Sequence, residues 1–495
     1  MSLCDLDAVT VRGLLGRKAV SATEVVQAAI ERIEAIDGAV NALPTRDFER
    51  ALAAARAADG RIRRGEALGA LEGLPIAVKD LEETAGLRTT FGSLLFRDHV
   101  PARDHSMVAA IRAAGGIVLA KSNTPEFGAG ANTRNLVFGA TGNPFDTTRT
   151  AAGSSGGSAV ALATGMVALA TGSDMGGSLR NPAAYCGIVG FRPTPGLVPN
   201  EKKLLGWAGL GVLGPMARTV ADLRLLLGVI AGDDAADPLA TTVPGRRIRH
   251  PGAFAAEAAD LASLRAAVTP DFGFAPTDRH VRAVFAERCA RMAPAFSAFE
   301  EATPDCGGSD DCFAVLRGLS FLAGFKDMVA RTPELVGPNV RANVAEALRL
   351  DAAAVADAMK HQTVLYRRWL AFFERHDVLI SPMMTIAPRP WAELYPAEID
   401  GVPTRSYYHW LALAYAVTLV GHPAVTIPCG VDRDGMPFGI QLVGPRGADA
   451  RLLAIAEALE RHLAAEADTA RPLPDLARLA SAPPIAASPG FLEMG

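Results

Sequence analysis

The sequence has few cysteines and no long run of charge of one sign. Its six cysteines among 495 residues are too sparse and too irregularly spaced for a disulfide framework, so we expect reduced thiols and a cytoplasmic location. Lysine and arginine total 49 against 53 acidic residues, which gives a net charge of −4 without a basic cluster. This balance argues against nucleic acid and against an anionic membrane as partners.

We also expect no targeting or membrane-spanning segment. The first residues lack the basic and apolar regions of a signal peptide. The most apolar run, 159–170, is interrupted by Thr164 and Gly165 and is too short to cross a bilayer. Cys306 and Cys312 match no zinc-binding spacing, so we expect no metal. With 49% hydrophobic and 21% charged residues, the composition is that of a folded soluble protein.

Helix and strand patterns alternate along the chain. A capping box, Ser21-x-x-Glu24, predicts a helix to about residue 36, and the apolar run 74–78 predicts a buried strand with Lys79 at its end. Further helices are predicted over 46–64, 104–114 and 449–462, and further strands over 117–120, 378–381, 424–427 and 439–443. This alternation predicts the α/β class, with one large domain and a twisted mixed sheet between helical layers.

The chain also divides by composition. We expect an N-terminal helical segment over 1–70, a main domain over 71–465 with a helical insertion at about 277–375, and a proline-rich tail over 466–495. The tail is predicted to be extended or disordered. A stretch rich in proline, glycine and alanine, 233–263, is predicted to be a long connection.

Two loops dense in glycine and serine carry the chemistry of this sequence. The first covers 152–158 and the second covers 172–180, with one apolar stretch between them. Glycines allow close approach of backbone to a ligand, and consecutive N–H groups can bind the oxyanion of acyl transfer. A serine nucleophile needs a base, yet no histidine lies near these loops in the sequence. Lys79 is a candidate base, because a buried lysine loses charge readily, and a sequence-distant histidine is the alternative.

Lys79, the loop Gly153-Ser154-Ser155-Gly156-Gly157-Ser158 and the run from Asp174 to Ala183 together resemble the amidase signature family of Ser-Ser-Lys hydrolases. Ser178 lies 24 positions after Ser154, which matches the spacing of that family, and the resemblance spans about residues 5–465. It implies that Ser178 is acylated and that Ser154, in a cis peptide, relays the proton to Lys79. It also implies an oxyanion hole made by the N–H groups of Met175, Gly176, Gly177 and Ser178, structural roles for Asp174 and Arg180, no cofactor, and a homodimer.

One position departs from the family pattern. Many relatives have glycine where this chain has Ala152. The difference puts the local backbone conformation in doubt, whereas the lysine and both serines of the motif are present.

A cluster of aromatic residues indicates which class of substrate the protein binds. Six of the chain's 30 aromatics lie between Trp391 and Tyr415, about four times the average density. Such rings suit a neutral aromatic or amphipathic amide, carbamate or oligoamide, with Tyr407, Tyr408 and Trp410 on the pocket wall. The alternative is that these rings pack a helix or a dimer contact.

Two other functions stay open. One is the amidase-like component of a tRNA-dependent glutamyl or aspartyl amidotransferase, although residues 195–200 depart from the pattern of that component. The other is a noncatalytic binding protein on the same fold.

Overall fold

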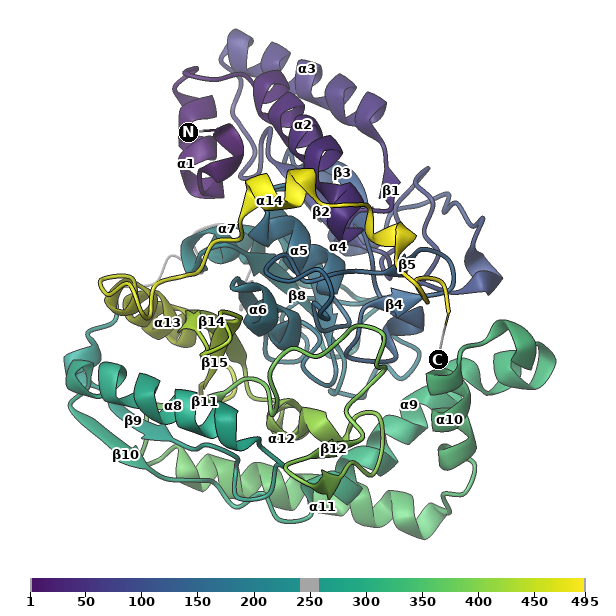
Figure 1. Ribbon diagram of the computed structural model, residues 1–495, viewed down its shortest axis with the longest axis vertical. Coiled ribbons are helices and arrows are strands. Elements are labelled where there is room, and N and C mark those ends of the chain that lie inside the picture. The colour runs from purple at the N-terminus through teal and green to yellow at the C-terminus, as the bar shows by residue number, and fades with distance from the viewer. Residues whose placement is uncertain (1, 241–257, 494–495) are drawn as a thin grey trace.

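A mixed β-sheet forms the centre of the molecule (Figure 1). In the computed structural model, which describes residues 2–240 and 258–493, this sheet has eleven strands. From one edge to the other they are β1 (Thr45–Arg46), β3 (Ile117–Ser122), β2 (Pro75–Lys79), β6 (Leu169–Asp174), β8 (Val212–Ala217), β7 (Val189–Arg192), β14 (Ala424–Val431), β15 (Pro437–Val443), β11 (Val378–Pro382), β9 (Arg265–Val268) and β10 (Ala298–Glu301). Two short strand pairs lie outside it: β4 (Arg134–Asn135) with β5 (Gly139–Ala140), and β12 (Glu398–Ile399) with β13 (Val402–Pro403).

The direction of the strands determines where functional residues meet. Strand β2 is parallel to both β3 and β6, and it pairs Ile76 with Leu169. Because carboxyl ends of parallel neighbours lie at the same edge of a sheet, the ends of β2 and β6 come together. All five residues of β2 are buried, which explains why the strand reads as a continuous apolar run before Lys79.

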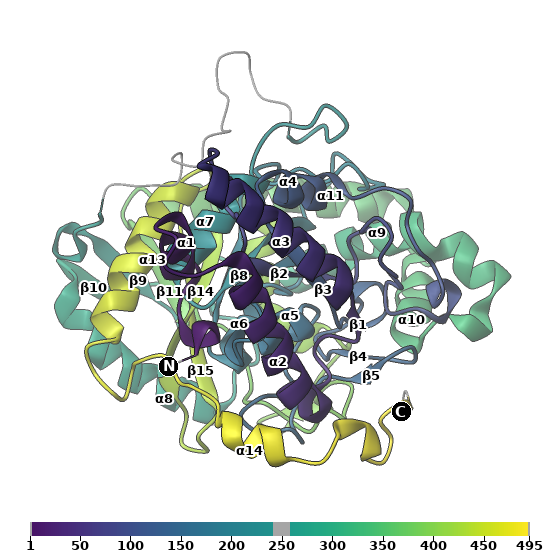
Figure 2. The same cartoon turned by 90° about the horizontal axis from the view of Figure 1, so that it is seen from above.

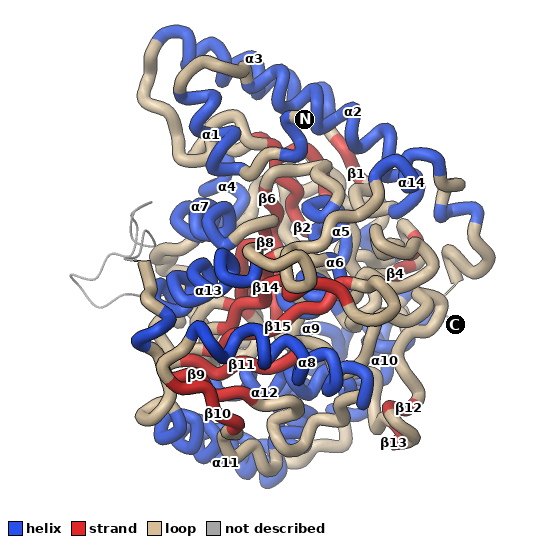
Figure 3. The backbone as a smooth tube through the Cα atoms, turned by 60° about the vertical axis from the view of Figure 1, so that its left-hand side comes forward, coloured by secondary structure: helices blue, strands red, loops and turns tan. Residues whose placement is uncertain are grey.

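Helices cover both faces of the sheet. They are α1 (Ala8–Gly16), α2 (Ala22–Val40), α3 (Phe48–Arg64), α4 (Ser106–Ala113), α5 (Gly156–Ala163), α6 (Arg180–Cys186), α7 (Val220–Ile230), α8 (Arg279–Met292), α9 (Ser309–Arg331), α10 (Pro338–Ala347), α11 (Ala352–Phe372), α12 (Ala412–Val420), α13 (Asp449–Leu463) and α14 (Leu476–Ser481). Figure 3 shows α4, α7 and α13 on one side of the strands and α5 and α6 on the other. Helix α5 packs on β2, β3, β6 and β8, and α7 packs on β6, β7 and β8. The predicted fold class, one large α/β domain with a mixed sheet between helical layers, is confirmed.

Local sequence rules explain several helix ends. The Ser21 side chain accepts a hydrogen bond from the Glu24 N–H, and the Glu24 side chain accepts one from the Ser21 N–H, so the predicted capping box is present. Helix α2 continues to Val40, four residues beyond the expected end, and stops where Asn41 adopts a left-handed conformation with φ of 53°. No helix within residues 2–240 and 258–493 has the length and apolar character needed to cross a membrane.

The region predicted as a helical insertion also contains a strand. Strand β10 runs parallel to β9 at the edge of the central sheet and pairs Phe299 with Ala266. Its sequence, Ala-Phe-Glu-Glu, is short and mostly exposed, so it has no apolar alternation from which a strand could be predicted. In the N-terminal segment, β1 likewise joins the sheet through β3. Of the predicted connection over 233–263, residues 241–257 lie outside the described part of the chain.

The C-terminal segment is not merely extended. Helix α14 packs against α2, and so does the 3-10 turn Ile485–Ala487 (Figures 1 and 2). Leu479 and Ile485 are buried in these contacts, and Asp475 caps α14 by accepting a hydrogen bond from the Arg478 N–H. Prolines separate these turns without preventing Leu479 and Ile485 from docking. Residues 476–481 and 485–487 are therefore helical where the composition predicts an extended or disordered tail.

Candidate active site

The edge where β2 and β6 end brings a lysine together with three serine hydroxyls. Lys79 is the last residue of β2, and its Nζ atom lies 2.7 Å from Oγ of Ser154, 2.9 Å from Oγ of Ser155 and 2.9 Å from Oγ of Ser173. Ser173 lies at the end of β6, and the other two serines directly precede α5. Sequence reasoning missed Ser173, although its place beside Asp174 at the end of a strand parallel to β2 brings it there.

Burial sets the electrostatics of this group. Lys79 is completely buried, and the loss of hydration lowers its pKa to about 8 against the opposing effect of Glu82 and Asp174. Burial also raises the pKa of Glu82 to about 7. Glu82 Oε2 accepts a hydrogen bond of 3.3 Å from Thr171 Oγ1, while its Oε1 is buried without a hydrogen-bond partner among the described residues. A lysine with a lowered pKa beside hydroxyl groups can accept a proton near neutral pH.

A buried carboxylate holds the loop between β6 and α6. Asp174 accepts hydrogen bonds from the Gly177 N–H at 3.0 Å and the Leu179 N–H at 3.2 Å. Arg180 binds both of its oxygens, at 3.0 and 2.9 Å, and Arg192 adds a contact of 3.3 Å. Although burial alone would raise it, these cations hold the pKa of Asp174 well below its ordinary value. In the structure, Asp174 and Arg180 therefore support the loop.

One of the four N–H groups expected in the oxyanion hole makes a hydrogen bond within the loop. The N–H of Gly177 donates to Asp174, so it is committed within the loop. Met175, Gly176 and Ser178 line the adjacent cavity and stay candidates for oxyanion donors. Gly177 has φ of +96°, and a Cβ atom there would lie 2.3 Å from Oδ1 of Asn181, so no other residue fits.

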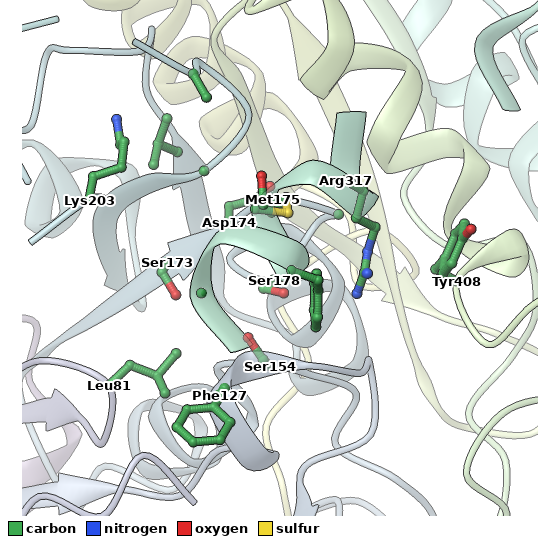
Figure 4. Close-up of a pocket in the computed structure, with 18 of the residues that line it drawn as sticks. Leu81, Phe127, Ser154, Ser173, Asp174, Met175, Ser178, Lys203, Arg317 and Tyr408 are labelled. Carbon is green, nitrogen blue, oxygen red and sulfur yellow. The ribbon is translucent and has the colours of Figure 1, made fainter. Parts of the chain in front are cut away.

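A cavity of about 300 Å³ opens at this group, and Ser154, Ser173 and Ser178 all line it (Figure 4). Ser155 is fully buried and is not part of the lining, which separates it from Ser154. The peptide bond between Gly153 and Ser154 is cis, as the resemblance implies. No histidine lines the cavity in the described part of the chain, so a Ser-His-Asp arrangement has no support there.

The aromatic cluster predicted from the sequence contributes only in part. Tyr407 and Tyr408 line the cavity, but Trp410 does not. The Trp410 side chain is buried elsewhere, where its Nε1 donates a hydrogen bond of 2.8 Å to the Tyr407 carbonyl and its ring borders a separate small cavity beside Tyr185. A high density of aromatic residues predicts that this segment lies near the cavity. The direction of each ring depends on the local backbone, here the 3-10 turn His409–Leu411.

Further rings reach the cavity from segments that sequence reasoning did not select. Phe127 lies in a short turn after β3, and Phe313, Phe321 and Phe325 come from α9. Their spacing along α9 places the three phenylalanines near one face of that helix. This spacing is the feature of the sequence from which a shared apolar face could be predicted. Arg317 on the same helix also lines the cavity.

Known proteins match nearly the whole chain. A family model with the description Amidase matches residues 24–453. An acylamidase of Rhodococcus erythropolis is 33% identical over 452 residues, which cover 89% of this chain and 92% of the relative. One component of the glutamyl-tRNA(Gln) amidotransferase of Acidothermus cellulolyticus is 35% identical over 492 residues, which cover 92% and 93%. A solved bacterial aryl acylamidase of the amidase signature enzymes superposes with a TM-score of 0.85 and 25% identity, covering 92% and 96%.

Proposed function

The chain belongs to the amidase family, whose members act on C–N amide bonds, and we propose that it hydrolyses amides through an acyl-enzyme on Ser178. One observation carries the proposal. The buried amine of Lys79 lies 2.7 Å from Oγ of Ser154, and Ser154 shares a cavity with Ser178. This arrangement supports a relay in which Lys79 is the base, Ser154 passes the proton and Ser178 is the nucleophile.

The reaction begins with Lys79 in its neutral form. Ser178 Oγ attacks the amide carbon and gives its proton to Ser154, whose own proton passes to Lys79 Nζ. N–H groups of Met175, Gly176 and Ser178 hold the tetrahedral oxyanion, and one such donor typically lowers the barrier by about 3 to 4 kcal/mol. The C–N bond then breaks as the proton returns through Ser154 to the leaving amine. Water attacks the Ser178 ester by the same relay, releases the acid and restores the hydroxyl.

The cavity walls support the substrate class expected from the sequence. Phe127, Phe313, Tyr407 and Tyr408 surround the space beside the serines with aromatic faces. A volume of about 300 Å³ suits a small organic molecule. The scissile group is therefore an amide, or a related carbamate or oligoamide bond, next to an aromatic or amphipathic body.

The test compares Ser178→Ala with Ser320→Ala, since Ser320 lines the cavity on α9 and belongs to neither loop. Aniline release from a series of acyl anilides is measured for each variant. We expect Ser178→Ala to lose turnover and labelling by a fluorophosphonate probe, whereas Ser320→Ala keeps both. Full activity in Ser178→Ala would overturn the assignment, and absence of labelling in the wild type would favour a noncatalytic binding protein.

A second candidate function is that of the amidase-like component of a tRNA-dependent amidotransferase, because the relative from Acidothermus is 35% identical over 492 residues. This alternative predicts ammonia release from glutamine and copurification with companion proteins. We favour the amidase because the only acidic side chain among the described residues that line the cavity is Asp174, which Arg180 and Arg192 already neutralise. The ammonium group of free glutamine would find no carboxylate partner there.

A further inference from the structure

A buried cation lines the substrate cavity away from the two catalytic loops. Arg317 projects from α9 and is only 6% exposed. Figure 4 shows its side chain between Ser178 and Tyr408. We propose that Arg317 binds a carboxylate on the substrate, so that the natural substrate is an amide with an apolar body and one anionic group. This inference rests on the proposed function and replaces the expected neutral substrate with a monoanionic one.

The guanidinium is held by neutral partners. Its two terminal nitrogens donate hydrogen bonds to Oδ1 of Asn343 and to the hydroxyl oxygen of Tyr407. Asn343 is fixed in turn, because its Nδ2 donates to the Tyr407 hydroxyl at 2.8 Å and to the Asn339 carbonyl at 2.6 Å. These contacts fix the plane of the guanidinium, and a planar, fixed guanidinium matches the two oxygens of a carboxylate.

Aromatic rings complete its surroundings. The guanidinium carbon lies 4.1 Å from the ring centre of Phe321, 5.0 Å from that of Tyr407 and 4.9 Å from that of Tyr408. Among the described residues, no carboxylate forms an ion pair with the Arg317 guanidinium within 4.0 Å. The carboxylate of Glu346, on the neighbouring helix α10, instead accepts a hydrogen bond of 3.0 Å from the Tyr408 hydroxyl. A buried cation without an ion-pair partner is costly, so an anion supplied by the ligand would satisfy it.

The other charges at the cavity point to the same class of ligand. Lys203 is a second cation in the lining, and its nearest carboxylate, Asp237, is 3.9 Å away. Asp174 is bound by Arg180 and Arg192. The field inside the cavity therefore favours a substrate with one negative charge and disfavours a substrate with an ammonium group.

The experiment uses anilides that differ only at the far end of the acyl chain. The monoanilide of adipic acid is compared with hexananilide, and the pair is repeated for chains of four to eight carbons. A second pair moves the charge to the leaving group, as N-hexanoyl-4-aminobenzoate against N-hexanoyl-4-toluidine. We expect the wild type to favour the carboxylate member at least tenfold in kcat/KM in one of these pairs.

Variants assign that preference to Arg317. In Arg317→Met we expect the ratio between charged and neutral members to fall at least fiftyfold, mainly through KM, while Arg317→Lys keeps an intermediate ratio. Lys326→Met removes an exposed cation from the same helix and should leave the ratio unchanged. If Arg317→Met does not fold, competitive inhibition of the wild type and Arg317→Lys by adipate provides the comparison, with weaker inhibition expected in the variant.

The contrary results are distinct. Hydrolysis of neutral anilides with rejection of the carboxylate member in every pair overturns the inference and leaves the proposed function standing. An unchanged ratio in Arg317→Met assigns Arg317 to joining α9, α10 and residue 407, which also overturns the inference. Failure to hydrolyse any anilide contradicts the proposed function, and the inference falls with it.

Discussion

Nζ of Lys79 lies 2.7 Å from Oγ of Ser154, and Ser154 in turn reaches the cavity that the fully buried lysine does not line. We therefore expect a proton from the cavity to reach Lys79 through a hydroxyl group. We expect Lys79→Ala to lower kcat by about a thousandfold, within the range for loss of a general base. Ser154→Ala should have an intermediate effect between this variant and the wild type. Steady-state kinetics on an acyl anilide check both, and wild-type kcat in Lys79→Ala would rule out the lysine as base.

The second prediction concerns the acid limb of the pH profile. The proposed mechanism needs neutral Lys79, so kcat/KM should rise with pH through the lysine pKa, which burial lowers to about 8. The charge of Glu82 opposes that shift, so Glu82→Gln should lower the lysine pKa further and move the acid limb to lower pH, by about one pH unit. Asp174, the other anion that raises this pKa, stays in place.

The control for that profile is Glu83→Gln, because Glu83 pairs with Lys202 and His99 instead of the active-site lysine. Its acid limb should coincide with that of the wild type. A profile of Glu82→Gln that moves to higher pH would mean that Glu82 does not act on Lys79 through its charge. In Lys79→Ala the limb should flatten.

The third prediction concerns the loop carboxylate. Asp174→Asn leaves Arg180 and Arg192 buried without their counter-charge, so the free energy of unfolding should fall by about 3 to 5 kcal/mol. Because the pKa of Asp174 is depressed, its contribution is present above the unfolded value near 4 and is lost as the pH falls below it. Urea unfolding at pH 7 measures the loss.

An exposed acid serves as the comparison for this substitution. Asp327 forms a surface pair with Arg331 and is 80% exposed, so Asp327→Asn should change stability by less than about 0.5 kcal/mol. Equal effects of the two substitutions would show that the buried carboxylate does not hold the loop.

The fourth prediction addresses Ala152, where relatives often have glycine. Ala152 is buried with φ of +60°, a left-handed conformation that costs alanine about 1 to 2 kcal/mol. Ala152→Gly removes that cost but also a buried methyl group and some order of the unfolded chain, so stability should change by less than about 1 kcal/mol. Ala152→Val should destabilise by more than about 2 kcal/mol, because a branched side chain does not tolerate this conformation. Thermal unfolding of both variants checks the order.

Sequence reasoning located the parts of this protein that depend on local pattern. The capping box of α2, the buried strand before Lys79 and helix α13 follow from residues adjacent in the chain. The proposed triad followed from a family motif, and the structure brings Lys79 and Ser154 into contact.

Sequence reasoning did not identify the residues whose position depends on packing between distant segments. Arg317 and Phe313 reach the cavity because α9 packs against α10, α11 and α12. The spacing of residues along α9 indicates a shared face, but it does not indicate what that face meets. Trp410 was selected by density alone and points elsewhere. Strand β10 has too few apolar residues to be predicted from its sequence. It forms because it pairs with β9.

The contacts of Lys79 join segments that are far apart in the chain. Ser154 is 75 residues away and Ser173 is 94 residues away, and the link depends on parallel pairing between β2 and β6. Such closure is slow and is achieved only when the intervening chain has been organised. During refolding from denaturant, helical circular dichroism should therefore recover before turnover does. Enzyme activity in this protein reports the completion of long-range assembly, and a partly refolded population would be helical yet inert.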